Sequence, residues 1–210
     1  MRTEEIRNWL ESLTRSYGNP RRSVDEAPLR ALYDAKDWPG LVSRIKTTLL
    51  LGPLRVKLRL VAESKEPAPM WINGLSDMPM FGTREFNGHT VTLSAKSAFL
   101  KERSFETIVL GFAHELCHAV ADAVRQEYFN VEETIDLTAM FLGFSNFYLK
   151  GAKVRIFKTA PGYEESLAVL KELSPRAHAA MLKELEVSAD QLTGYLSIDE
   201  IRYARALMRC

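Results

Sequence analysis

The sequence predicts an α+β fold that is rich in helices and carries one small sheet. Apolar residues recur at helical spacing along most of the 210 residues, whereas strand-like alternation is found mainly in residues 54–94. The composition, with 46% hydrophobic and 26% charged residues, is that of an ordinary globular chain. Its length favours one compact domain. Within that domain we expect a helical region over 1–52, a mixed core over 53–150 and a second helical region over 151–210.

Charge and hydropathy exclude several classes of function. Lys and Arg number 28 against 27 Asp and Glu, and no run of like charge occurs, so we expect no nucleic-acid partner. The longest apolar run, 137–149, is too short and too often interrupted to cross a membrane, so we expect no membrane partner either. The first ten residues lack the apolar region of a secretory signal, and the only cysteines are Cys117 and Cys210. We therefore expect a cytoplasmic protein; no feature of the sequence indicates its oligomeric state.

Three short helices are expected within residues 1–50. Two groups of apolar residues recur with the spacing of one helix face, namely Ile6, Leu10 and Leu13, followed by Leu29, Leu32 and Tyr33. Gly18, Pro20 and Pro39 separate the helical stretches because these residue types interrupt regular structure.

A small antiparallel or mixed sheet is expected next. From Leu54 to Leu60, apolar residues alternate with basic ones, which predicts a half-exposed strand. Asn87-Gly88 lies between residues 78–86 and the alternating segment 89–94, and Asn-Gly is a strong signal for a hairpin turn. Because residues 78–86 contain a proline and a glycine, we expect this arm of the hairpin to be partly loop.

Helices dominate after residue 94, apart from a possible short strand at 153–157. The apolar run over 137–147 predicts a buried helix that packs against the apolar stripe of Ile108, Phe112, Leu116 and Ala119. The last helix is expected to begin at Ser197, because Glu200 three residues later completes a capping box.

The strongest functional signal is an H-E-x-x-H motif within an uncharged helical run. His114 and His118 are four residues apart, so they share one helix face and both imidazoles can reach one zinc ion. Glu115 is rotated by about 100° from His114, which places it to hold a water molecule on the metal. The chain has only four histidines, so two of them at this spacing favour a metal site over unrelated core histidines.

A catalytic zinc commonly has three protein ligands, so one more donor is needed. Asn130 is a predicted N-cap of a second helix, and Glu133 can turn back to complete that cap. Glu132 is then free to face the metal. Asp136, one turn beyond Glu132, is placed to accept the spare N–H of a ligating histidine.

Three nearby residues have alternative interpretations. Glu133 and Asp122 are the other candidates for the third ligand, and carboxylates also favour a helix N-terminus without any metal. Cys117 is more readily explained as a small buried apolar residue than as a thiolate ligand.

These motifs resemble those of the gluzincin group of zinc metallopeptidases. The matching residues are His114, Glu115 and His118, with Glu132, Asp136 and Ala139 in a downstream E-x-x-x-D-x-x-A. The order of strand, short helix and motif helix is similar to that of soluble bacterial minigluzincins, including IrrE-like regulatory peptidases, and of the soluble core of CAAX-prenyl-type peptidases. The resemblance covers roughly residues 85–145. It departs at Gly111, where such motifs often have Val or Thr, and Cys117 occupies the second variable position.

The resemblance implies a zincin-like fold that hydrolyses a peptide or protein substrate, with Zn²⁺ held by His114, His118 and Glu132 and with Glu115 as general base. It also implies that the substrate pairs as an extra strand with residues 89–94. Gluzincins often stabilise the oxyanion with a Tyr or His from beyond the third ligand. The candidates are Tyr148, Tyr163, His178 and Tyr195, and the sequence does not choose among them. The alternative function is a zincin-fold metal-binding module that regulates or binds a partner without turnover.

Overall fold

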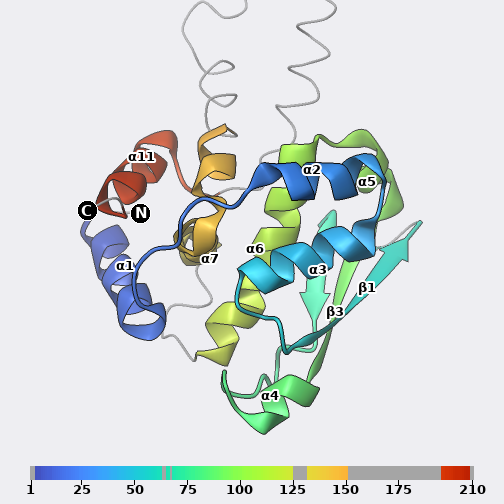
Figure 1. Cartoon of the computed structure of the whole chain (residues 1–210), viewed down its shortest axis with the longest axis horizontal. Helices are drawn as coiled ribbons and strands as arrows, with labels where there is room; N and C mark the ends of the chain where they lie inside the picture. The colour runs from blue at the N-terminus through green and yellow to red at the C-terminus, as the bar shows by residue number, and fades with distance from the viewer. Residues whose placement is uncertain (1–2, 63–64, 67, 125–131, 151–194, 209–210) are drawn as a thin grey trace, which may run out of the picture.

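The computed structural model describes residues 3–62, 65–66, 68–124, 132–150 and 195–208. In these ranges, helices pack against one mixed three-stranded sheet (Figure 1). The predicted α+β class is therefore confirmed. No helix within the described ranges combines the length and the hydropathy that a membrane span requires.

The three helices predicted near the N-terminus are present as α1 (Thr3–Tyr17), α2 (Glu26–Asp34) and α3 (Trp38–Thr48). The Asp25 carboxylate caps α2 by accepting a hydrogen bond from the Ala27 N–H, and Asp37 caps α3 in the same way through Gly40. Pro39 lies in the first turn of α3, where its missing N–H costs no hydrogen bond.

The sheet consists of β1 (Arg55–Val61), β2 (Met70–Asn73) and β3 (Thr90–Lys96) in the order β1-β3-β2. The central strand β3 pairs parallel to β1 and antiparallel to β2. The strands predicted around 54–60 and 89–94 are confirmed as β1 and β3, and the sheet is of the mixed type.

The predicted hairpin over residues 78–94 is wrong. Residues 84–88 form the short helix α4 (Arg84–Gly88), which the Thr83 hydroxyl caps by accepting from the Phe86 N–H. Neither Asn87 nor Gly88 has the positive φ that the predicted turn requires. The fully buried Phe86 anchors this helix, while strands from earlier in the chain pair with β3. Tertiary packing therefore overrides the local turn signal.

The motif helix α6 (Phe105–Ala123) follows α5 (Ser97–Glu102) and crosses the centre of the molecule (Figure 1). It packs against α3, α7 and β2. The predicted apolar stripe is fully buried; its members are Ile108, Phe112, Leu116 and Ala119. Because nearly every face of α6 is covered, its polar side chains are held in fixed positions.

The segment predicted as a buried helix over 137–147 is largely buried, as expected, but it is not one continuous α-helix. It consists of α7 (Glu132–Ala139), the π-helical turn η1 (Met140–Phe144) and a helical segment over 145–150. The break is at Gly143, which has a φ of 116°. A Cβ at this position would lie 2.9 Å from the Arg22 carbonyl oxygen, so a glycine is needed.

The last helix, α11 (Ile198–Leu207), begins with the predicted capping box between Ser197 and Glu200. It packs against α1, so the two ends of the described chain lie together (Figure 1). The short strand predicted at 153–157 lies outside the described residues.

Candidate metal centre

Both motif histidines project from the same face of α6. Their ring centroids are 5.1 Å apart, and the ring planes are nearly perpendicular at 81°. His114 is buried, whereas the side chain of His118 is 24% exposed. The pair therefore spans the boundary between the core and solvent, where an ion or a substrate has access.

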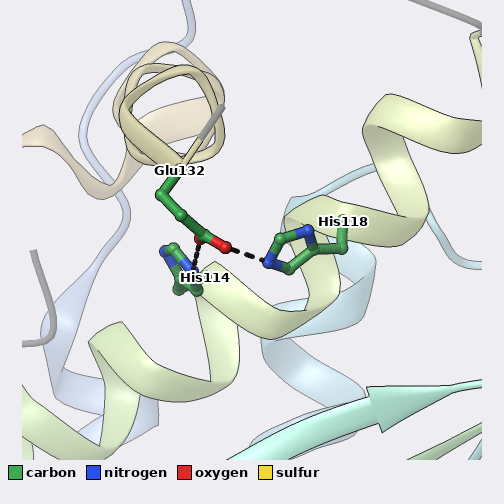
Figure 2. Close-up of side chains that lie close together, drawn as sticks. All are labelled: His114, His118 and Glu132. Carbon is green, nitrogen blue, oxygen red and sulfur yellow. Dashed lines mark hydrogen bonds and ion pairs between the residues drawn. The ribbon is translucent and has the colours of Figure 1, made fainter. Parts of the chain in front are cut away.

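Glu132 reaches this pair from the first turn of α7, which packs against α6. Its Oε2 atom is 3.0 Å from His114 Nε2 and 3.6 Å from His118 Nε2. Figure 2 shows the carboxylate directed between the two imidazoles. One ligand atom from each of these three residues lies within 4.8 Å of the others, so the group could hold a metal ion.

The separations suit a small divalent ion. Ligand bonds of about 2.0 to 2.2 Å place two donors on a tetrahedral zinc about 3.3 Å apart. The two distances to Glu132, 3.0 and 3.6 Å, lie on either side of this value. Two imidazole nitrogens and one carboxylate oxygen also form the ligand set of a common class of catalytic zinc site. The residues present therefore fit the predicted cofactor.

Asp136 organises the site from the buried side. Its Oδ1 atom accepts hydrogen bonds from His114 Nδ1 at 2.9 Å and from the Tyr148 hydroxyl at 2.7 Å. Its Oδ2 atom accepts from the backbone N–H of Tyr195 at 2.6 Å. Because an ionised carboxylate only accepts hydrogen bonds, Nδ1 of His114 carries a proton and Nε2 is directed to Glu132.

The electrostatics of the metal-free group follow from these contacts. Burial lowers the pKa of His114, but hydrogen bonds to Asp136 and Glu132 outweigh this effect and raise it to about 10. The same bond to His114 lowers the pKa of Glu132. Burial and the charge on His114 lower the pKa of His118. In the absence of metal, a proton on His114 thus supplies positive charge between two carboxylates.

Glu115 lies beside the ligand group without belonging to it. Burial raises the pKa of its carboxyl to about 7, and the charge of Glu132 adds to this shift. The carboxylate accepts a hydrogen bond from the backbone N–H of Ile72 in β2. Glu115 is therefore held between the motif helix and the edge of the sheet.

The alternative ligands are not part of the group. Among the described residues, the group that could hold an ion consists of His114, His118 and Glu132 and does not include Glu133 or Asp122. Cys117 is fully buried, as predicted, and burial raises the pKa of its thiol well above the usual range. The predicted N-cap, Asn130, lies outside the described residues.

Of the four residues predicted as candidates to stabilise the oxyanion, Tyr195 has its ring against the ligand group. The ring stacks on His114 with centroids 5.7 Å apart and an interplanar angle of 28°, and 56% of the residue is exposed. Burial and the neighbouring carboxylates raise the pKa of its phenol, so the hydroxyl keeps its proton at neutral pH. Tyr148 is buried with its hydroxyl bound to Asp136. Tyr163 and His178 lie outside the described residues.

The expectation that a substrate pairs with residues 89–94 is wrong. Strand β3 already has β1 on one side and β2 on the other, so its backbone has no free edge. The edge strand beside α6 is β2. Its Met70 packs over Gly111, where an added Cβ would lie 1.8 Å from the Met70 Cε atom. A side chain at position 111 would therefore require the Met70 methyl group to shift.

Comparison of the chain with protein-family models, curated proteins and solved structures finds no match. The functional interpretation therefore depends on the geometry of the site and on the motif.

Proposed function

We propose that this chain is a zinc-dependent metallopeptidase with a zincin-like fold, related to the gluzincins. The observation that carries the proposal is the convergence of His114, His118 and Glu132 within 4.8 Å, with one further carboxylate, Glu115, beside them. A purely structural metal site does not need a carboxylate that stays outside the ligand set. Its presence therefore favours catalysis over a metal-binding module without turnover.

The proposed reaction is hydrolysis of a peptide bond. Zinc in such a site lowers the pKa of a coordinated water to about 7 and polarises the substrate carbonyl. Glu115 would accept a proton from the attacking water and deliver it to the departing amine. Its position supports this role, because the carboxyl is half-buried beside the ligand group and burial raises its pKa in the metal-free chain.

Tyr195 is proposed to stabilise the charge that develops on the carbonyl oxygen. Its exposed ring stacks on His114, and its phenol is protonated at neutral pH, so it can donate a hydrogen bond. The backbone hydrogen bond from Tyr195 to Asp136 fixes the start of this segment relative to the ligands.

The edge strand β2 is proposed to bind the substrate backbone by strand addition. The hydrogen bond from the Ile72 N–H to Glu115 supports this assignment, because it places the edge of β2 next to the general base. An extended peptide along β2 would therefore bring its carbonyl groups to the metal.

The decisive comparison is between the wild-type chain and Glu115→Gln, each loaded with zinc and tested on a fluorogenic peptide library. We expect Glu115→Gln to retain zinc and thermal stability and to lose hydrolysis by about 10²- to 10⁴-fold. The matched control is Glu133→Gln, which neutralises a carboxylate near the site but outside the ligand group and should keep full activity. Equal activity in the wild type and Glu115→Gln would remove the proposed base. Zinc binding without any hydrolysis by the wild type would instead indicate the module without turnover.

A further inference from the structure

We propose that the chain has a second binding site, for a small organic anion with at least two negative charges. The site is a cavity of about 350 Å³ between residues 20–23, the segment around η1, and α11. Its polar lining consists of Arg21, Arg22, Ser23, Ser145, Asn146 and Arg205. None of the residues that line it belongs to the metal group.

The charge of this cavity is the first argument. Three arginine residues line it, and none of the described residues that line it is acidic. The chain as a whole is nearly neutral, with 28 basic and 27 acidic residues, so the cluster does not follow from composition. Several arginine residues around one cavity attract a multivalent anion more strongly than a single charge would. Arginine also binds phosphate and carboxylate groups through paired hydrogen bonds.

The second argument is that hydrogen bonds hold the walls in place. The Arg21 N–H donates to the Phe141 carbonyl, and the Val24 N–H donates to the Gly143 carbonyl, each at 2.9 Å. These bonds fix the arginine segment against η1, where the chain kinks at Gly143. On the opposite wall, Arg205 Nη2 donates to Asn146 Oδ1 at 2.9 Å. A site held in this way loses little conformational freedom when a ligand binds.

The size of the cavity indicates the class of ligand. Cavities of about 300 to 1,000 Å³ are typical of small-molecule sites, so the volume suits an organic body better than a lone inorganic ion. The hydroxyls of Ser23 and Ser145 and the amide of Asn146 supply neutral hydrogen-bonding groups for such a body. A sugar phosphate and a small dicarboxylate share the required chemistry.

The test is isothermal titration calorimetry of the full zinc-loaded chain at low ionic strength. Ribose 5-phosphate represents the phosphates, succinate represents the dicarboxylates, and ribose is the uncharged control. We expect saturable one-site binding of at least one anion and none of ribose. Arg205→Gln should weaken this binding at least about tenfold. The matched control is Arg202→Gln on the same helix, because Arg202 is exposed and does not line the cavity.

Each outcome decides the proposal. Tighter binding of ribose 5-phosphate or of succinate supports the site and identifies the phosphate or the carboxylate class. Absence of saturable binding by both anions overturns it, as does equal affinity in the wild type and Arg205→Gln. Because Arg205 contacts Asn146, Arg22→Gln in the exposed loop is the second variant, with an unfolding curve as its folding control. Binding that survives in Arg205→Gln but disappears in His118→Ala would place the anion at the metal and also overturn the proposal.

Discussion

Asp136 fixes the orientation of His114 through a hydrogen bond of 2.9 Å between Oδ1 and Nδ1, which leaves Nε2 of the imidazole directed at Glu132. The carboxylate is fully buried and also accepts from Tyr148 and from the Tyr195 backbone. A residue on α7 therefore connects the motif helix with the segment that precedes α11.

Asp136→Asn should weaken zinc binding by about 10- to 100-fold, because the amide has one acceptor oxygen and no charge, so it cannot accept the bonds from His114, Tyr148 and the Tyr195 backbone together. Zinc affinity is measured by competition with a chromogenic chelator. Tyr148→Phe is the control, since it removes one donor to Asp136 and leaves the bond to His114 intact. Unchanged affinity in Asp136→Asn would show that this carboxylate does not position the ligand.

Glu132→Gln should lower zinc affinity by at least about tenfold, because a neutral amide is a poorer ligand and no longer balances the charge of the ion. Glu133→Gln, one residue further along α7, should bind zinc as the wild type does. Elemental analysis after dialysis against a fixed free-zinc buffer measures both. The reverse ranking would assign the third ligand to Glu133.

Zinc binding at pH 7 should release at least one proton, because the pKa of His114 is about 10 in the metal-free chain and Glu115, with a pKa of about 7, is partly protonated there. Titration calorimetry in two buffers with different ionisation enthalpies counts the protons that are released.

The pH dependence follows from the same histidine. The pKa of His114 is raised above its usual value of 6.5, so the stability that protonated His114 contributes is complete below pH 6.5 and is lost as the pH rises through 10. Zinc affinity should accordingly increase with pH over this window. An affinity that is independent of pH would contradict the charged state of His114.

Tyr195→Phe should reduce kcat by about 10²- to 10³-fold if its hydroxyl stabilises the oxyanion, while zinc content stays the same. The retained ring preserves the stacking on His114, and the backbone bond to Asp136 does not involve the side chain. Steady-state kinetics on a cleaved peptide measure the effect. A rate equal to that of the wild type would leave Tyr195 with a packing role only.

Gly111→Val should destabilise the fold by about 1 to 3 kcal/mol, because the new side chain overlaps Met70 of β2. Gly88→Ala is the control, since an added Cβ at Gly88 meets no atom within 4 Å. Urea unfolding curves of both variants give the free energies of unfolding. Introducing Met70→Ala into Gly111→Val should recover part of the loss, and failure to do so would locate the strain elsewhere.

Local patterns predicted those parts of the fold that depend on local interactions. The spacing of apolar residues located α1 to α3, alternation located β1 and β3, and Ser197 with Glu200 located the start of α11. The hairpin failed because Asn-Gly is only a local preference, whereas Phe86 packs in the core and β2 pairs with β3. The four residues of β2 are too few to show a reliable alternation.

In the candidate site, too, the sequence predicts what depends on local spacing and does not predict what depends on tertiary packing. His114 and His118 share a face because they are four residues apart on one helix, which is a local relationship. Glu132 meets them only because α7 packs against α6. The stacking of Tyr195 on His114 joins residues far apart in the chain, and no local pattern could select it over the other candidate aromatics.

X-ray absorption spectroscopy at the zinc edge of the loaded full chain tests the central claim most directly. The account predicts one tightly held zinc with nitrogen and oxygen neighbours at about 2.0 to 2.2 Å, and with the outer scattering of two imidazoles. A sulfur neighbour at about 2.3 Å, a single imidazole, or failure to retain zinc would contradict the assignment of His114, His118 and Glu132 as the metal site.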